Sequence, residues 1–510
     1  MSSTLAFAQI PIEDLLTQLL PTGVHTHAGG QPITGTGRTV EVRDPATGRL
    51  VGEWSDTSVA GADAACDAAT VAAPGWQRLG AFGRAAVLRR VGDAIADHAE
   101  DLAVLEAASA GKPIRDCRGE VAKVAEMFHY YSGWADKIAG QTLPVPGDWL
   151  TYTRREPYGV VLAITPWNAP LFTAAWNTAP ALAAGNTVVI KPSEYTPHTT
   201  LRMVQIAEAA GLPDGVLNVA CGYGATIGDA LVNDDRISKI TFVGSVPTGR
   251  SVAARAAARG VPSLLELGGK SANIIFDDAD LAAAVHGAVT GIFLGAGQSC
   301  VAGSRLLVHD SVYDKVVERL VAVTQELPIG QPLHEGTVIG PLGNQSQLHK
   351  VRDLLQIAQS EGGVLLTDPD RLPGSLNREG YWVAPTIVGG VQPEHTLENT
   401  EAFGPVLALA PFTDEDEAIE RANQTAFGLA GAVWTSNVSR AHRIASQLDA
   451  GTVWINAYKT IHVAAPFGGV GGSGWGRSSG PDALSEYTQS KCVWTPIASD
   501  PIGCLPQVLP

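Results

Sequence analysis

The sequence has few charged residues for its length, and acidic residues outnumber basic ones. Only 17% of the 510 residues are charged, and 35 Lys and Arg stand against 51 Asp and Glu, for a net charge of −16. A chain this acidic, without a dense stripe of Lys and Arg, is a poor electrostatic match for nucleic acid or an anionic membrane. The low charged fraction argues against disorder and indicates extensive burial, which is consistent with a subunit interface.

Cysteine pairs and metal-binding histidine motifs are also missing. Six cysteines are scattered along the chain without a CxxC pair, which argues against a disulfide framework or a zinc site and indicates reduced thiols. No histidine spacing resembles HExxH, and His25 and His27 lie in a loop-like stretch where we expect surface residues. We therefore expect no metal cofactor.

Long apolar runs are absent as well. None reaches the ~18 residues of a membrane helix, and Glu13 and Asp14 interrupt what would be the apolar part of a signal peptide. We expect a cytoplasmic protein with no membrane partner and no nucleic-acid partner.

The order of helical and strand-like segments predicts an α/β fold. At roughly 150 residues per domain, the length allows about three units. Residues 158–165 (YGVVLAIT) form a nearly continuous apolar run, which is typical of a buried parallel strand. Strands then alternate with helices in two series, up to residue 267 and from 272 to about 470, which favours a doubly wound parallel sheet. Before them we expect an irregular stretch over residues 1–60, ending in a short strand-like segment at 48–54, and helices over 58–73, 81–109 and 121–134.

Two glycine-rich loops resemble motifs that bind nucleotides. Gly469–Gly474 fits GxGxxG, but no strand precedes it directly and no helix clearly follows. Gly244–Gly249 is one residue from a P-loop, with Arg250 where Lys is required, which argues against ATP. The same loop follows a strand and opens a helix, so its N–H groups and the Ser245 hydroxyl could bind a pyrophosphate. The alternative is an ordinary turn between strand and helix.

Three residues are candidates for catalysis. Cys300 lies among small residues in a Gly-rich break, where a nearby helix N-terminus would lower the pKa of the thiol; the alternative is a buried structural cysteine. Glu266 lies inside an apolar strand, where desolvation should raise the carboxyl pKa toward that of a general base, unless it is a salt-bridged structural acid. Asn168 follows a buried strand and could donate to an oxyanion, or cap a turn between prolines.

Lys191 and Glu194 end the next strand and could hold a ribose or form an exposed ion pair.

Seven segments recur in the order of one known family. They are PWNAP (166–170), KPSE (191–194), FVGSVPTG (242–249), LELGGKSANIIFDDADL (265–281), GQSCVAGSR (297–305), EAFGPV (401–406) and PFGG–SG–GR (466–477). Together they resemble the NAD(P)-dependent aldehyde dehydrogenase family, from about residue 40 to 493. The segment after YYSGWADKIAG (130–140), and EYTQSK (486–491), resemble that family's oligomerisation hairpin and last strand.

The resemblance implies an aldehyde dehydrogenase-like α/β fold in three parts. Residues 1–138 and 158–265 would form a Rossmann-type NAD(P)-binding domain, and 266–483 an α/β catalytic domain. Residues 139–157 and 484–510 would form a small β oligomerisation element and a proline-rich tail. The implied assembly is a homodimer or homotetramer.

The family also implies roles for individual residues. Cys300 matches the nucleophile, Glu266 the general base and Asn168 an oxyanion donor. Lys191 and Glu194 match the adenosine-ribose ligands; Glu401 and Phe403 match the residues at the nicotinamide ribose and ring. The implied cofactor-binding set is Thr165, Trp167, Lys191, Glu194, Gly224, Gly244, Ser245, Gly249, Leu267, Glu401 and Phe403. NAD is favoured because Glu194 would repel a 2′-phosphate, and NADP remains possible.

The implied substrate is an aldehyde that is oxidised to its acid. The implied pocket residues are Ala169, Thr173, Trp176, Ser299, Val301, Ile461 and Phe467. Ala169 and Thr173 stand where many members carry bulkier side chains, which suggests a wide tunnel and a bulky or aromatic aldehyde. Lys459 could attract an anionic substrate. Ser478 replaces an acid that is common after the GR motif.

Two other functions compete with this interpretation. A CoA-acylating aldehyde dehydrogenase fits less well, because such members tend to lack the acid found at Glu266. A structural or binding protein that reuses the fold would be expected to lose Cys300 or Glu266, and the sequence keeps both.

Overall fold

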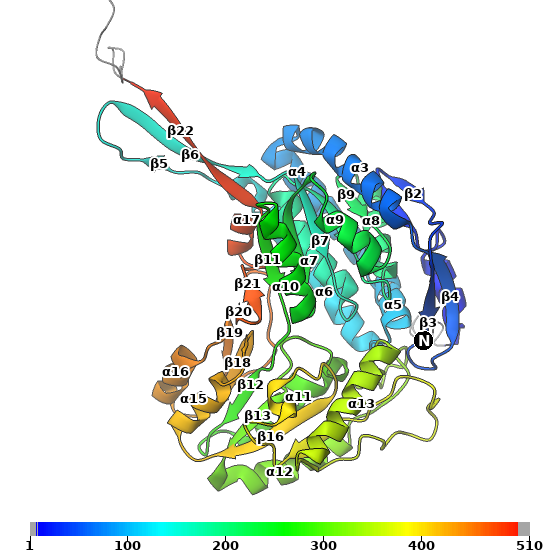
Figure 1. Ribbon diagram of the computed structural model, residues 1–510, viewed down its shortest axis with the longest axis vertical. Helices are drawn as coiled ribbons and strands as arrows, with labels where there is room; N and C mark the ends of the chain where they lie inside the picture. Colours follow the sequence, from blue (N-terminus) through cyan, green and yellow to red (C-terminus); the bar gives the residue numbers. More distant parts are fainter. Residues whose placement is uncertain (1–6, 8, 498–510) are drawn as a thin grey trace, which may run out of the picture.

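The computed structural model describes residue 7 and residues 9–497, and its larger sheet occupies the upper part of Figure 1. Eight strands are ordered β2-β1-β9-β8-β7-β10-β11-β21, and the five from β9 to β11 run parallel. Their bounds are β1 Thr26–Ala28, β2 Gln31–Ile33, β7 Val160–Ile164, β8 Thr187–Lys191, β9 Leu217–Val219, β10 Ile237–Val243, β11 Ser263–Glu266 and β21 Gly474–Trp475. The parallel order confirms the predicted doubly wound arrangement.

Helices cover both faces of this sheet because its central strands are apolar on both sides. In β7, Val161 and Ala163 pack into one core and Val160 and Leu162 into the other. The first core contains α4 (Gly80–Asp97), α5 (Ala99–Ala110), α6 (Ile114–Ser132), α7 (Pro170–Ala183) and α8 (His198–Ala209). The second contains α3 (Ser58–Arg78), α9 (Asp229–Val232) and α10 (Val246–Ala258).

A second sheet lies below the first in Figure 1 and has seven strands in the order β14-β15-β16-β13-β12-β18-β19. Its strands are β12 Ala272–Ile275, β13 Arg305–His309, β14 Val364–Leu365, β15 Thr386–Gly389, β16 Val406–Phe412, β18 Ala430–Trp434 and β19 Thr452–Ile455. One face packs on α11 (Leu281–Phe293), α12 (Asp310–Gln325) and α13 (Gln345–Ser360). The other packs on α15 (Glu415–Asn423) and α16 (Val438–Gln447).

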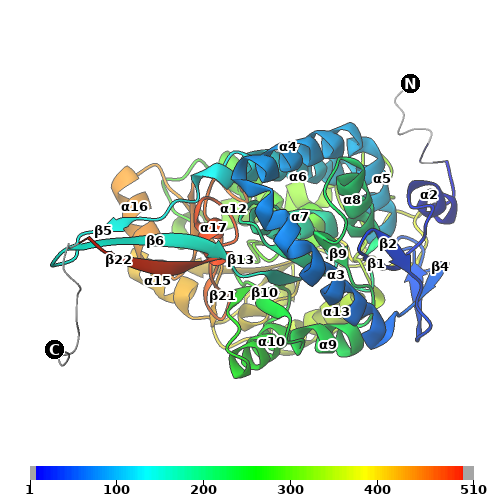
Figure 2. The same cartoon turned by 90° about the horizontal axis from the view of Figure 1, so that it is seen from above.

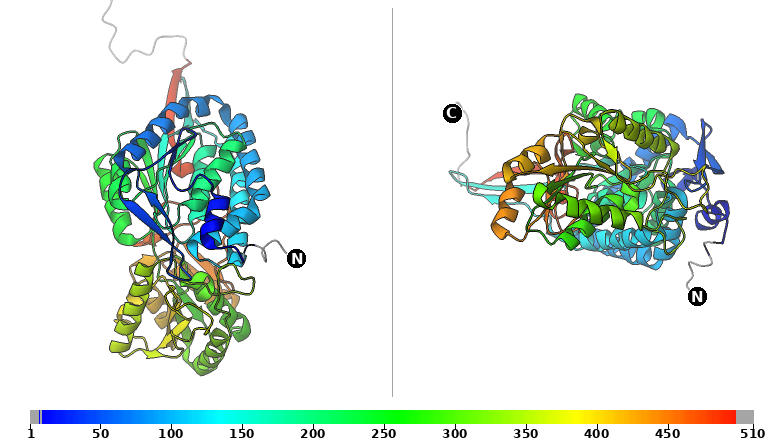
Figure 3. Two further views of the ribbon diagram at one scale, coloured as in Figure 1. Left: turned by 90° about the vertical axis from the view of Figure 1, so that its right-hand side faces the viewer. Right: turned by 90° about the horizontal axis from the view of Figure 1, so that it is seen from below.

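A three-stranded ribbon projects away from both sheets (Figures 1 and 2). It pairs β22 (Thr488–Pro496) with β6 (Trp149–Pro157), and β6 with β5 (Thr142–Leu143), all antiparallel. Near its tip the rings of Trp149 and Trp494 meet edge to face, and Trp494 and Ile497 are exposed. The views of Figure 3 show the same projection. Most of the proline-rich tail lies outside the described residues.

The structure corrects several details of the expected secondary structure. Helix α2 (Ile12–Leu19) and strand β3 (Thr39–Arg43) lie within the stretch expected to be irregular. Strand β3 pairs with β4 (Leu50–Ser55), which overlaps the strand-like segment expected at 48–54. The helix expected over 81–109 is two helices, because the backbone of His98 leaves the helical conformation between α4 and α5. The remaining short elements are β17 (Phe427–Gly428) with β20 (Val470–Gly471), α14 (Thr396–Asn399) and α17 (Asp482–Glu486).

The histidines expected at the surface are buried. His25 is 4% and His27 5% exposed, because β1 pairs with β9 inside the sheet. His27 Nε2 lies 2.8 Å from Glu208 Oε2. The partners of His27, Glu208 and Val219, lie more than 150 residues away in the sequence. A local sequence pattern therefore does not predict this burial.

Candidate active site

The candidate residues gather at the carboxyl edge of the larger sheet. Ile164 of β7 is in register with Lys191 of β8, and Val243 of β10 with Glu266 of β11. The loops that follow these parallel strands therefore leave the same edge, where open α/β sheets place their ligands.

Cys300 lies in a turn that follows a tightly bent segment. Residues 294–297 form a 3₁₀ turn in which Gly295 and Ala296 have positive φ angles of 70° and 54°. A Cβ atom on Gly269 would come within 2.3 Å of the Cys300 carbonyl oxygen. Only glycine permits this approach, which places Cys300 against the chain that leaves β11.

The surroundings of the Cys300 thiol differ from the sequence expectation. No described helix begins at this turn, and burial raises the thiol pKa to about 12, with the nearby carboxyls of Glu266 and Glu401 adding to the rise. Lys459 and the backbone N–H of Val301 oppose the increase. The prediction of a pKa lowered by a helix terminus was wrong, because the dominant influence is desolvation.

Glu266 is a buried carboxyl, as expected, and it is the last residue of β11 rather than a residue inside the strand. Its side chain is 6% exposed, and burial raises its pKa to about 8. Ser478 Oγ donates to Glu266 Oε1 at 2.8 Å, while Oε2 has no protein partner among the described residues. This contact depends on β21 pairing against β11, since a side chain at Gly474 would collide with the Leu265 carbonyl oxygen.

Asn168 is fixed to the loop that carries Cys300. Its Nδ2 donates to the carbonyl oxygen of Gln298 at 2.8 Å. Gln298 is itself held, because its Oε1 accepts the Gly343 N–H at 2.8 Å and its Nε2 donates to the Gly295 carbonyl. An amide nitrogen has two N–H groups, so the second can serve another acceptor near the thiol.

Aromatic side chains stand beside Cys300. Trp176 of α7 contacts Phe172 and meets Phe467 edge to face at 5.8 Å between ring centres. Ala169 and Thr173 occupy the start of the same helix, where Thr173 Oγ1 donates to the Ala169 carbonyl. The apolar cluster around the thiol includes Val301, Cys300, Tyr458, Ile461 and Phe467. Ser299 is half-buried next to Cys300, whereas Val301 is fully buried.

The Gly244–Gly249 loop opens α10, as the sequence indicates. Ser245 is the residue before the helix, and no side chain of the described residues caps the first turn. A Cβ at Gly249 would come within 2.4 Å of Leu267, so the helix can approach Leu267 only with glycine there. Gly224, which begins a π-helical turn at residues 224–228, has open space around its Cα. Uncapped N–H groups at a helix start form an anion site.

Lys191 and Glu194, for which the sequence allows either ribose binding or an exposed ion pair, contact each other. The two groups are 3.4 Å apart, but Lys191 is only 4% exposed, so the pair is not an exposed one. Thr165, at the end of β7, is buried with a hydroxyl that has no partner among the described residues. Hydroxyl, ammonium and carboxylate groups together match the donor and acceptor needs of a ribose.

Glu401 and Phe403 approach the same region from the second sheet. Glu401 Oε1 accepts the Gly269 N–H at 2.9 Å, and a Cβ on Gly268 would lie 2.4 Å from Oε2. Phe403 has a positive φ of 52° and meets Trp167 edge to face at 5.5 Å.

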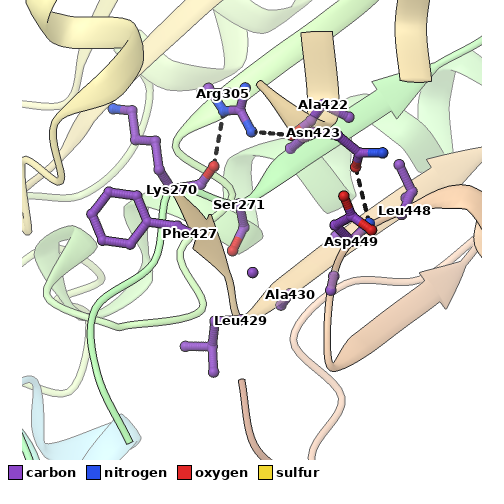
Figure 4. A pocket seen from close by; sticks show the side chains of 14 residues that line it. Lys270, Ser271, Arg305, Ala422, Asn423, Phe427, Leu429, Ala430, Leu448 and Asp449 are labelled. Atoms are coloured by element: carbon purple, nitrogen blue, oxygen red, sulfur yellow. Dashed lines mark hydrogen bonds between the residues drawn. The ribbon is translucent and has the colours of Figure 1, made fainter. Parts of the chain in front are cut away.

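A separate pocket is lined by residues of β18 and of the ends of α15 and α16 (Figure 4). Arg305 donates to the carbonyl oxygens of Lys270, Arg421 and Ala422. These contacts tie the start of β13 to the end of α15, which indicates a structural role.

Two contributors to the site are missed by sequence reasoning. Gln298 is part of the Cys300 motif, but its partner Gly343 lies in a loop with no recognisable signal. Ser478 is visible only as a departure from the family pattern, and its contact with Glu266 spans 212 residues. Among the described residues, no helix is long and apolar enough to cross a membrane, and no three acidic, His or Cys side chains are placed to hold a metal.

A thiol, a carboxyl with a raised pKa and an uncapped helix start at one sheet edge are typical of an oxidoreductase that uses a cysteine and a nucleotide. The model of the Aldehyde dehydrogenase family matches residues 33–493, and the chain belongs to that family.

Several relatives are similar in sequence to this chain along almost its whole length. A betaine aldehyde dehydrogenase of Cereibacter sphaeroides is 42% identical over 468 residues, covering 91% of this chain and 95% of that one. Retinal dehydrogenase 2 of Homo sapiens is 41% identical over 463 residues, covering 90% and 89%. The NAD⁺ complex of an aldehyde dehydrogenase from Bacillus cereus has a TM-score of 0.92 at 39% identity, covering 95% and 98%.

Proposed function

We propose that this chain oxidises aldehydes to carboxylic acids with NAD⁺, using Cys300 as the nucleophile and Glu266 as the general base. The observation that carries the proposal is the convergence of Cys300, the buried Glu266 carboxyl and the Asn168 amide, which is anchored to the Cys300 loop. NAD⁺, when bound, accepts the hydride that leaves the substrate carbon. A solved relative contains NAD⁺.

The residues at this edge of the larger sheet fit this cofactor. The uncapped start of α10 suits the pyrophosphate, and the orphaned Thr165 hydroxyl lies near the Lys191–Glu194 pair, which suits a ribose. The Glu194 carboxylate would repel a 2′-phosphate, which favours NAD over NADP. Glu401 would accept from the nicotinamide ribose, and Trp167 and Phe403 would border the ring.

The first step needs a thiolate in a buried, negatively charged site. Glu266 can accept the thiol proton of Cys300, which leaves the carboxyl neutral and the sulfur negatively charged. The neutral carboxyl no longer repels the thiolate, and the pair of groups carries one negative charge before and after the transfer. The thiolate then attacks the aldehyde carbon and forms a hemithioacetal. Its oxyanion accepts from the Asn168 amide and the Cys300 N–H.

The second step releases the product. Loss of the hydride converts the hemithioacetal into a thioester on Cys300, and Glu266 then releases the thiol proton to solvent, which restores its carboxylate. Glu266 removes a proton from water, which attacks the thioester and frees the acid and the thiol. A carboxyl with a pKa of about 8 is matched to this task near neutral pH.

Replacing Asn168 with Ala should slow acylation selectively. We expect kcat to fall by roughly 10²–10³, the usual effect of one lost oxyanion donor, with little change in NAD⁺ affinity. Single-turnover kinetics of reduced nicotinamide formation measure it. Because Asn168 also holds the Gln298 carbonyl, Asn168→Asp serves as the comparison: it keeps the shape without the N–H donor, and near-normal turnover in that variant would contradict the oxyanion role.

The substrate we propose is a bulky aldehyde with an anionic group. The relatives act, by name, on betaine aldehyde and on retinal, so likeness alone does not select a substrate. Ala169 and Thr173 are small, and Lys459 lies beside the Cys300 cluster. Lys459 Nζ donates only to the Leu294 carbonyl, at 3.3 Å, and forms no ion pair with the described residues. Its ammonium could therefore pair with a substrate carboxylate.

A panel of matched aldehydes tests both the reaction and the substrate. We expect reduced nicotinamide and acid in equal amounts, with kcat/KM highest for 4-formylbenzoate, about tenfold lower for its methyl ester, and lowest for acetaldehyde. Lys459→Met should erase the difference between the first two, and Lys459→Arg should keep it. If acetaldehyde gives the highest kcat/KM, the bulky-substrate proposal is wrong; equal values for acid and ester contradict only the role of Lys459.

We also propose the three-part organisation expected from the sequence, and a homodimer or homotetramer formed through the projecting ribbon. The exposed Trp494 and Ile497 on that ribbon support a contact there. A cytoplasmic location is proposed because the described cysteines, including exposed Cys492, are unpaired.

A further inference from the structure

Ser478 donates a hydrogen bond to Glu266 that has no role in the reaction proposed above. Ser478 is fully buried, and its Oγ lies 2.8 Å from Glu266 Oε1. The same Oγ lies 3.4 Å from the Phe467 carbonyl oxygen, and the Ser478 N–H donates to that carbonyl at 2.8 Å. The serine is therefore fixed by its backbone while its hydroxyl proton has two acceptors within reach.

We propose that Ser478 is a positioning residue that holds the Glu266 carboxyl through both of its protonation states; this rests on the proposed role of Glu266 as general base. With Glu266 ionised, the hydroxyl donates to Oε1. With Glu266 protonated, the carboxyl donates to Ser478 Oγ, and the hydroxyl turns toward the Phe467 carbonyl. The carboxyl keeps one anchor throughout, and Oε2 stays free for water or for the thiol proton.

The anchor favours the ionised base over the acid. A hydrogen bond to a carboxylate is stronger than one between neutral groups, so the hydroxyl lowers the pKa of Glu266 against the rise caused by burial. The other charged or titratable groups that influence Glu266 or respond to it are Arg477, Glu486, Cys300 and Tyr487. Arg477 donates to backbone carbonyls, and Glu486 is paired with Lys239 at 2.9 Å, so neither supplies a direct hydrogen bond to the base.

The chain contains a matched control one residue away. Ser479 is also buried, and its hydroxyl donates to the Ala465 carbonyl rather than to a carboxyl. Removing either hydroxyl leaves a similar defect in the same turn, but only Ser478 contacts the base.

The experiment compares the pH dependence of thioester hydrolysis in the full-length protein, using p-nitrophenyl acetate to acylate Cys300 without cofactor. Ser478→Ala should move the profile alkaline by about one pH unit, as expected for one lost charge-assisted hydrogen bond, and slow hydrolysis roughly tenfold near neutral pH. Ser478→Thr should restore the wild-type profile. Ser479→Ala should leave it unchanged.

Coincident profiles for Ser478→Ala and the wild type would overturn the proposal, as would an equal shift in Ser479→Ala. If Ser478→Ala does not fold, Ser478→Cys, a weaker donor of similar size, carries the same expectation. Failure of the general-base role itself is recognised separately, because Glu266→Gln would then hydrolyse the acetyl enzyme at the wild-type rate.

Discussion

Replacement of Cys300 with Ser should lower aldehyde oxidation by roughly four orders of magnitude or more, because a serine hydroxyl is far less acidic than a thiol and no histidine base is expected to activate it. The site is already unfavourable for an anion, since burial and two neighbouring carboxyls raise the pKa even of the thiol. Initial rates of reduced nicotinamide formation with a saturating aromatic aldehyde measure the effect. NAD⁺ affinity, followed by fluorescence quenching, should remain within about twofold.

The chain provides a control for general effects of losing a thiol. Cys492 lies exposed on β22 of the projecting ribbon, so Cys492→Ser should keep full activity. Iodoacetamide should inactivate the wild type and label Cys300, and bound substrate should slow the labelling. Turnover retained by Cys300→Ser at even a tenth of the wild-type rate would refute the covalent mechanism.

The parts of the fold that the sequence predicts best are the buried strands and the loops after them. The apolar run at 158–165 contains β7, and the loop at Gly244–Gly249 opens α10, because both follow from local pattern and backbone chemistry. The location of Glu266 at a buried strand end also follows from its apolar neighbours. These features need no knowledge of distant partners.

The features that escape prediction depend on distant contacts. Burial raises the thiol pKa of Cys300, and carboxyls brought in from β11 and from the loop before β16 add to the rise, neither of which the local Gly-rich pattern reveals. The anchor of Glu266 comes from a segment that reaches β11 only because Gly474 permits close pairing. The sequence therefore predicts the raised pKa of the Glu266 carboxyl, but not the raised pKa of the Cys300 thiol or the contact between Ser478 and Glu266.

Backbone strain is concentrated around the thiol. Of the five non-glycine residues with positive φ in the described chain, Ala296 precedes Cys300 on its loop, and Asn456 and Lys459 flank Tyr458 of its apolar cluster. Phe403 follows Glu401 by two residues. Each such conformation costs of order 1–3 kcal/mol and persists only where packing enforces it. The distribution supports a site whose geometry is maintained at some loss of stability.

Glu266 also links stability to activity. Replacing it with Gln should leave acylation possible, because the neutral amide no longer repels the Cys300 thiolate and the thiol proton can pass to solvent, but it should block hydrolysis of the thioester. The amide cannot take a proton from water, so thioester hydrolysis should fall by roughly 10²–10⁴. In the wild type, hydrolysis should rise with pH through about 8, as the carboxyl becomes ionised. In the variant this rise should disappear. Mass spectrometry of the quenched enzyme should show one acyl group on Cys300.

The same substitution should change stability in a defined pH window. The folded-state pKa of about 8 lies above the ordinary value of 4.5, so the native protein binds more protons than the unfolded chain between these values. The favourable contribution of Glu266 is therefore complete below about pH 4.5 and is lost as pH rises through 8. Glu266→Gln should raise Tm at pH 8 and leave a smaller difference at pH 5. If the variant hydrolyses its thioester normally, Glu266 is not the general base; if its Tm gain does not grow with pH, the Glu266 carboxyl does not have a raised pKa.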